Sequence, residues 1–257
     1  MKKLSTLNQI VFFTGFIVFI LLLNNSIKEA LLSNGIDSYN FHLGVKAFSN
    51  CILGIVSFFI ARKLNLIKLG GLSKTKPKKL WLLIFPLLFL VSLNGLFLDT
   101  IPNYNALNLI ILSIYCLSIG ISEELSIRSV LLPLLIRFFG KGKKATIKAI
   151  LISSLIFGLL HLIKFDKGIY GEISQVFFAT FIGISFGAIL VVIKRIYPLI
   201  IAHAVIDFVA KLDSINTPIK EVVAQPMNIE NSLITVLLTI PCLLYGVYVI
   251  KKQISLN

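Results

Sequence analysis

Charged residues are scarce in this sequence, at 14 % of its 257 residues against 57 % hydrophobic residues. A soluble globular domain carries about 25 % charged residues, so the composition excludes a water-soluble globule and a disordered chain. Cysteine is rare as well: the chain has three, Cys51, Cys116 and Cys242, in three separate apolar stretches. This number and placement exclude a disulfide scaffold and make a cysteine metal site a poor interpretation. Acids are also few, 11 against 25 basic residues.

Long apolar runs occupy most of the chain, and a membrane-spanning helix needs about 20 such residues. We predict an all-α, polytopic membrane helix bundle of about eight transmembrane helices, with residues 1–257 forming one integral membrane domain. The fourth run is too long for a straight crossing, and the seventh is short enough to be a re-entrant helix. The predicted spans are 9–23, 44–61, 80–98, 106–136, 146–163, 173–193, 197–210 and 232–250.

The basic residues lie mostly on one side of this arrangement. With the N-terminus inside, the inner segments carry 18 basic residues and no acid, whereas the outer loops carry six basic residues and eight acids. The positive-inside rule then predicts that both termini are cytoplasmic. The excess of basic residues therefore reflects membrane topology. We expect the lipid bilayer as a partner and do not expect nucleic acid. The outer loops are predicted to hold His42, Lys28, Lys46, Lys164, Lys167, Lys211, Lys220, Glu29, Asp37, Asp99, Asp166, Glu172, Asp213, Glu221 and Glu230.

The segment 62–79 between the second and third spans is the one linker-like stretch, with Gly70, Gly71 and Pro77 as helix breakers. We interpret it as a plain cytoplasmic loop, with contact to anionic lipid headgroups as the alternative.

Six ionisable residues fall inside the apolar runs, where a charged side chain costs about 2.5–3.5 kcal/mol on insertion scales. They are therefore candidates for a functional site. The set comprises Glu123, Glu124, Arg128, His161, His203 and Asp207.

Helical spacing relates these residues to one another. Glu124 and Arg128 are four residues apart and can form an ion pair on one helix face, whereas Glu123 lies about 100° further around and faces another neighbour. Phe157 and His161 share the i,i+4 spacing in the fifth span, as do His203 and Asp207 in the seventh. Because most of the ionisable groups lie about 18–24 Å from the cytoplasmic ends, and His203 about 12 Å, we expect one polar cavity.

A carboxylate and a histidine in such a cavity can activate water against a carbonyl carbon, with a second polar group stabilising the oxyanion. Other hydrolase motifs are missing: there is no H-E-x-x-H, Ser122 is followed by Glu123 rather than glycine, and Asp207 is the only intramembrane aspartate. Two other functions stay open. One is a non-catalytic membrane scaffold or immunity protein that binds a peptide or a sensor partner, and the other is a small transporter with a carboxylate proton relay.

Three motifs in order resemble the CAAX protease and bacteriocin-processing family of intramembrane proteases, also called the ABI family. Glu123-Glu124-Leu125-Ser126-Ile127-Arg128 matches E-E-x-x-x-R, Phe157 to His161 matches F-x-x-x-H, and His203 to Asp207 matches H-x-x-x-N/D. The resemblance covers residues 104–210. The chain departs from the usual pattern at Asp207, where the prenyl-protein proteases have asparagine. An ionised Asp207 would repel an oxyanion, so we expect it to be protonated or to orient His203.

The resemblance implies roles for these residues. Glu123 would be the general base, with His161 sharing the catalytic water, and His203 and Asp207 would line the oxyanion side. Glu124 would be held by Arg128 and shape the cavity, with Phe157 in support. We expect no cofactor; the alternative is zinc held by Glu123, His161 and His203. The expected substrate is a membrane-associated peptide or protein, in peptide maturation or bacteriocin self-immunity, because the Lys-, Ile- and Asn-rich composition is typical of a low-GC bacterium.

Overall fold

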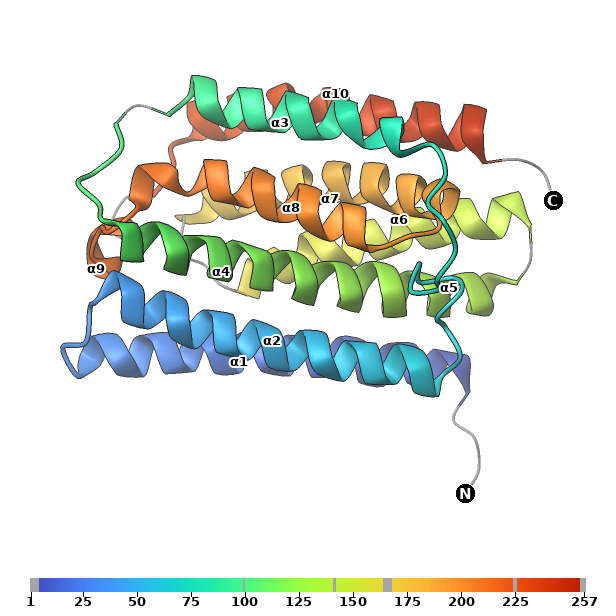
Figure 1. Ribbon diagram of the computed structural model, residues 1–257, viewed down its shortest axis with the longest axis horizontal. Coiled ribbons are helices and arrows are strands. Elements are labelled where there is room, and N and C mark those ends of the chain that lie inside the picture. The colour runs from blue at the N-terminus through green and yellow to red at the C-terminus, as the bar shows by residue number, and fades with distance from the viewer. Residues whose placement is uncertain (1–4, 99, 141, 164–167, 224–225, 255–257) are drawn as a thin grey trace.

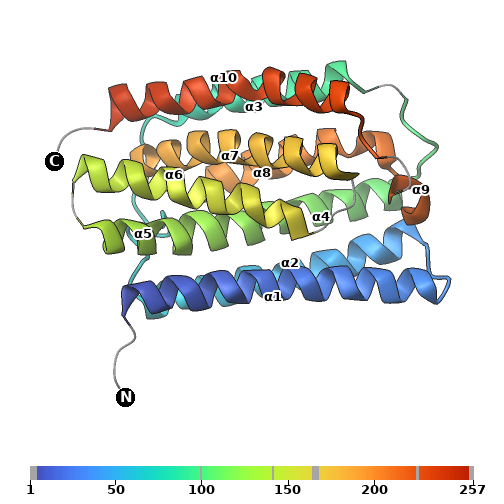
Figure 2. The ribbon, with the colours of Figure 1, turned by 180° about the vertical axis from the view of Figure 1, so that it is seen from behind.

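The computed structural model describes residues 5–98, 100–140, 142–163, 168–223 and 226–254, and every regular element in these ranges is a helix. The long helices lie alongside one another and follow the long axis of the molecule (Figures 1 and 2). The predicted all-α membrane helix bundle is therefore confirmed. The helices are α1 (Thr6–Ser33), α2 (Tyr39–Lys63), α3 (Ile84–Leu96), α4 (Ala106–Glu123), α5 (Leu132–Phe139), α6 (Lys143–Leu160), α7 (Gly168–Ile193), α8 (Tyr197–Ala210), α9 (Ile219–Val223) and α10 (Ile229–Gln253).

Three short segments connect or extend these helices. A 3₁₀ turn, Leu80–Leu83, leads into α3, and another, His161–Ile163, follows α6. A π-helical segment, Glu124–Leu131, joins α4 to α5, so that Ala106–Phe139 is one continuous helix of 34 residues. This explains why the fourth apolar run is too long for a single straight crossing.

Several helices begin where a side chain satisfies a free backbone N–H group. The side chain of Ser5 accepts a hydrogen bond from the N–H of Asn8 at the start of α1. At the start of α4, Asn105 and Asn108 each accept a hydrogen bond from the backbone N–H of the other, at 3.0 and 2.9 Å. The cap at Ser5 places the start of α1 three residues before the predicted run 9–23, whereas α4 begins at Ala106, where its run was predicted to begin.

The bundle has three layers (Figures 1 and 2). α1 and α2 form one side, α3 and α10 form the opposite side, and α4 to α8 lie between them. The middle layer holds α7, which packs against α6 and α10 and has 61 % of its most apolar window buried. Every residue of the predicted site therefore comes from the middle layer.

Six helices of the described chain are long and apolar enough to cross a membrane. The other two predicted spans form shorter apolar helices, Leu80–Leu96 and Tyr197–Ala210. The span predicted over 80–98 is shorter because it begins as a 3₁₀ turn and ends at Leu96. The chain is a multi-pass membrane protein.

Eight of the charged or polar residues assigned to outer loops lie in α-helices instead: Lys28, Glu29, His42, Lys46, Glu172, Lys220, Glu221 and Glu230. Lys28 is buried in α1 beside Glu29, at 3.1 Å. His42 is buried in the first turns of α2, where its Nε2–H donates to the carbonyl oxygen of Ile36 at 2.8 Å, and Lys46 lies one turn further on. The prediction was wrong here because a helix continues past the apolar stretch that reveals it. Lys2, Lys3, Asp99, Lys141, Lys164, Asp166 and Lys167 lie outside the described residues.

α8 comes very close to α4 at Gly120. A Cβ atom at this position would lie 2.6 Å from the carbonyl oxygen of Ile200 and 3.4 Å from the backbone nitrogen of Ala204. Because Gly120 lies one turn before Glu123 and Glu124, this contact sets the separation between those two carboxylates and α8.

We expect Gly120→Ala to force α8 away from α4, because the added methyl group meets backbone atoms that cannot rotate aside. Overpacking of this kind costs about 1–3 kcal/mol, so the melting temperature of the detergent-solubilised protein should fall. Gly44→Ala in α2 is the matched control, since its new methyl group would meet nothing within 4 Å. Equal melting temperatures for the two variants would contradict the close packing of α4 and α8.

Candidate active site

The two adjacent glutamates point in different directions because successive residues of a helix lie about 100° apart. The side chain of Glu124 is 0 % exposed, whereas that of Glu123 is 25 % exposed and lines a cavity. The sequence predicted this separation. Glu124 therefore belongs to the interior of the bundle, and Glu123 is the carboxylate that solvent or a substrate can reach.

Glu124 connects two basic groups through one oxygen. Its Oε1 lies 3.2 Å from Nη1 of Arg128 and 2.8 Å from Nδ1 of His203. The Arg128 pair has the geometry that the i,i+4 spacing predicts, and the contact with His203 comes from α8, on the other side of the close approach at Gly120. A carboxylate only accepts hydrogen bonds, so Nδ1 of His203 carries the proton.

Two aromatic rings cover the buried guanidinium of Arg128. Its Cζ lies 4.5 Å from the ring centre of Phe157 and 6.0 Å from that of Phe186. Both distances suit a cation–π interaction, which strengthens when the cation is desolvated. Phe157 was predicted as a supporting residue, but no motif or spacing marks Phe186, which is one phenylalanine in an apolar helix. The ring of Phe186 also contacts that of His203, edge to face.

His203 faces two more carboxylates with its other ring nitrogen. Its Nε2 lies 3.5 Å from Oε2 of Glu123 and 3.9 Å from Oδ1 of Asp207. The imidazole thus lies among three carboxylates, with Nδ1 fixed by Glu124 and Nε2 directed toward the others. A protonated Nε2 would be a hydrogen-bond donor next to Glu123.

Asp207 has a cationic partner that the sequence analysis missed. Its Oδ2 lies 3.3 Å from Nζ of Lys211, which directly follows α8. Burial opposes the charge of the Lys211 ammonium group, but the Asp207 carboxylate outweighs this effect and the pKa of Lys211 is raised. From the sequence we expected Asp207 to be protonated or to orient His203; the contact with Lys211 gives an ionised Asp207 a cation beside it. The i,i+4 spacing of the two residues was the signal for this pair.

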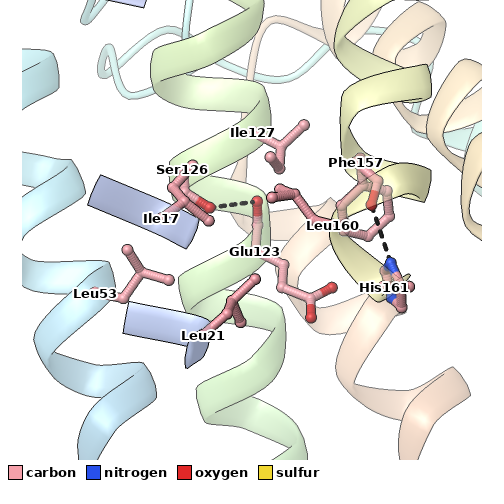
Figure 3. Close-up of a pocket in the computed structure, with 9 residues that line it drawn as sticks. All are labelled: Ile17, Leu21, Leu53, Glu123, Ser126, Ile127, Phe157, Leu160 and His161. Carbon is pink, nitrogen blue, oxygen red and sulfur yellow. Dashed lines mark hydrogen bonds between the residues drawn. The ribbon is translucent and has the colours of Figure 1, made fainter. Parts of the chain in front are cut away.

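His161 lies at the end of α6 beside Glu123 (Figure 3). Its Nδ1–H donates to the carbonyl oxygen of Phe157 at 3.0 Å, and the rings of these two residues meet edge to face. In the neutral ring Nε2 is then the nitrogen that accepts hydrogen bonds.

The four predicted catalytic residues, Glu123, His161, His203 and Asp207, line one cavity of about 440 Å³. Glu123 and His161 also line a second cavity of about 40 Å³, which Ile17 of α1 helps to enclose (Figure 3). A cavity needs about 10–15 Å³ of water-accessible volume to hold one water molecule. The smaller cavity can therefore hold water against Glu123, and the larger one can hold a peptide segment.

A metal ion held by Glu123, His161 and His203 was the alternative considered from the sequence. Among the described residues, no three His, Cys, Asp or Glu side chains are placed so that they could share a metal ion. The Nδ1 atoms of both histidines are engaged, by Phe157 and by Glu124, so Nε2 is the nitrogen that a metal would use. As they are placed, however, the three side chains do not converge on one metal position.

Residues 105–209 match the family model described as type II CAAX prenyl endopeptidase Rce1-like. Over these residues, about two fifths of the chain, the sequence is similar to that family. The resemblance to the CAAX protease and bacteriocin-processing family is thereby confirmed, over nearly the same residues as the motifs predicted. The family supports a membrane endopeptidase in general. Neither the curated proteins nor the solved structures contain a significant match to the chain.

We expect Arg128→Ala to lower both the amount of folded protein and its activity. The change leaves the fully buried Glu124 without its cation, and breaking a buried pair from one side costs about 3–5 kcal/mol in soluble proteins. The measurement is the yield and melting temperature of the detergent-solubilised variant.

The double variant Glu124→Gln with Arg128→Gln is the control, because neither charge is then left unpaired. It should recover more folded protein than Arg128→Ala, while activity stays low because His203 has lost the carboxylate that fixes its Nδ1. If Arg128→Ala keeps the wild-type yield and melting temperature, the pair is not structural and Arg128 becomes a candidate for direct contact with the substrate.

Proposed function

We propose that the chain is an intramembrane endopeptidase in which Glu123 activates a water molecule to cleave a membrane-associated peptide or protein. The observation that carries this proposal is the shared cavity: Glu123, His161, His203 and Asp207 line one space of about 440 Å³. The family match supports the same class of reaction.

The base is Glu123, with His161 as its partner. The Glu123 carboxylate takes a proton from a water that Nε2 of His161 also holds, and the water oxygen forms a bond to the carbonyl carbon of the peptide. The proton on Glu123 then passes to the nitrogen of the leaving amine as the C–N bond breaks. Glu123 ends the cycle as a carboxylate.

The oxyanion is stabilised from α8. With Nδ1–H of His203 bound to Glu124, a doubly protonated His203 presents Nε2–H toward the space beside Glu123, which is the donor that an oxyanion needs. Asp207 lies on the same side, and its pairing with Lys211 reduces the repulsion that a lone carboxylate would exert. Peptide maturation or bacteriocin self-immunity is the biological setting we propose, with prenylated proteins as the less favoured substrate.

We expect Glu123→Gln to abolish processing while membrane abundance and melting temperature stay close to wild type. Loss of a general base costs about 10²–10⁴-fold in rate, and this partly exposed side chain makes no buried ion pair with a permanent cation. His161→Ala should lose a similar fraction of the processing rate. The double variant Glu123→Gln with His161→Ala should lose little more than either single variant, because a base and its partner act as a unit.

Processing can be measured by comparing the peptides in membranes from cells that carry the wild type with those from cells that carry Glu123→Gln. Glu230→Gln is the matched control, since Glu230 is an exposed glutamate in the first turn of α10. Wild-type turnover by Glu123→Gln on a verified substrate would reject the mechanism and favour the non-catalytic scaffold.

We expect proteolysis by the purified protein to survive a strong chelator. A metal-dependent enzyme would contain about one equivalent of zinc and lose it together with activity. The test is to measure the zinc content and the cleavage rate of the same samples before and after chelation. The result distinguishes a metal-free enzyme from a metal-dependent one. Zinc at one equivalent that leaves with the activity would reverse the assignment of Glu123 as a metal-free base.

A further inference from the structure

The depth of Glu123 in its cavity follows from the register of α2 and α4. These helices run in the same direction, and a residue of α2 lies beside the residue 68 positions later in α4. Nδ2 of Asn108 donates to Oδ1 of Asn40 at 3.0 Å, and Nδ2 of Asn50 donates to Oγ of Ser118 at 3.1 Å. The register therefore holds over at least ten residues.

The cavity extends from Glu123 toward the end of the bundle where α2 and α4 begin. Lys46 of α2 also lines it and in this register is level with residue 114, nine positions before Glu123. At 1.5 Å per residue, Glu123 lies about 14 Å further in than Lys46. The outermost lining residues, among them Tyr39, Asp213 and Ile219, come from the start of α2, the turn after α8, and α9.

The lining of this outer part is mixed. Apolar side chains such as Leu43 and Phe178 lie among charged and polar ones, which are Lys46, Glu172, Gln175, Lys211 and Asp213. The charged and polar side chains can bind the N–H and C=O groups of a polypeptide main chain, which a wholly apolar passage would leave unsatisfied. The passage can therefore admit a peptide toward Glu123.

The opposite end of the site is covered by residues 64–73, which we call the strap. Leu66 of the strap is fully buried. Gly70 packs so closely on Ser129 that a Cβ atom would lie 2.6 Å from its carbonyl oxygen, and Oγ of Ser129 donates to the carbonyl oxygen of Gly70 at 2.7 Å. Nη2 of Arg137 donates to the carbonyl oxygen of Leu64 at 2.9 Å. The strap is therefore part of the packed bundle rather than the plain loop that the sequence suggested.

The strap lies at the basic end of the molecule. The first turn of α1, the last turn of α10 and the connections from α2 to α3, from α5 to α6 and from α7 to α8 all lie at this end (Figure 1). Of the 18 basic residues of the sequence analysis, the 15 that the structure describes lie in these segments or in the adjoining helix turns, and the positive-inside rule places this end in the cytoplasm. α9 lies at the other end (Figures 1 and 2), and its residues Ile219 and Val222 line the cavity.

We propose that the catalytic cavity opens to the outer face of the membrane, so that its substrates are peptide segments exposed on that face, such as exported or translocated membrane-associated peptides. The nature of the substrate rests on the proposed function, and the orientation rests on the charge distribution. The strap and the buried Glu124–Arg128 pair beneath Glu123 separate the site from the cytoplasmic end.

Labelling of single introduced cysteines in the full-length protein tests this proposal without any need for proteolysis. In intact cells, a small membrane-impermeant thiol reagent should label Asp213→Cys and Lys46→Cys several-fold above the wild-type chain, whose own three cysteines set the background. Lys76→Cys, at the strap end, should stay at background until the cells are permeabilised. Ser214→Cys serves in place of Asp213→Cys if that variant does not fold.

The outcomes separate clearly. Labelling of Lys76→Cys in intact cells would overturn the proposal, and so would an Asp213→Cys thiol that reacts only after permeabilisation or in detergent. The expected labelling together with wild-type processing by Glu123→Gln would support the outward opening while rejecting the proposed function. Loss of processing in Glu123→Gln together with labelling from the cytoplasmic side would keep the protease and reject the outward opening.

Discussion

The carboxylate of Glu124 is fully buried, and a buried anion is stable only where cations and hydrogen-bond donors surround it. Arg128 of the same helix and His203 of α8 both lie against its Oε1. One oxygen atom thereby ties α8 to the α4–α5 helix and fixes the orientation of the imidazole. With Nδ1 committed to Glu124, Nε2 of His203 is directed toward Glu123. The position of the reactive groups therefore follows from one interior ion pair.

The local backbone is adapted to this pair. Glu124 and Arg128 lie within the π-helical segment Glu124–Leu131, and single π turns are frequent at functional sites. Oγ of Ser126 donates to the carbonyl oxygen of Ser122 at 2.6 Å, so a side-chain hydroxyl satisfies a main-chain group where the helical hydrogen-bond pattern changes. On the other side, Gly120 lets α8 approach closely enough for His203 to reach Glu124. The π-helical segment that contains Glu124 and the absence of a side chain at Gly120 both favour the contact between Glu124 and His203.

Much of this arrangement could be predicted from local spacing, and the rest depends on how helices are rotated against one another. The pairing of Glu124 with Arg128 follows from the i,i+4 geometry of any helix. The contact of His203 with Glu124 could not be foreseen, because it depends on the distance and rotation of α8 relative to α4. Lys46 and Lys211 were assigned to loops because their charges mark the end of an apolar pattern. In the structure, Lys46 lies within α2 and Lys211 lies in the turn that follows α8. No motif or spacing in the sequence indicated that Phe186 contacts Arg128 and His203.

The charges of the site show why Glu123 is the group best suited to move a proton. Three carboxylates meet around His203, and two of them have permanent cations as partners: Glu124 pairs with Arg128, and Asp207 pairs with Lys211. Glu123 lies 3.5 Å from His203 and beside His161, and neither imidazole is a permanent cation. Arginine stays protonated in proteins, and a lysine beside a carboxylate keeps its proton more firmly, so those two pairs are electrostatically fixed. Glu123 lines the cavity instead. Of the three carboxylates around His203, it is therefore the one that the two ion pairs between permanent charges do not include, which supports its proposed role as the base.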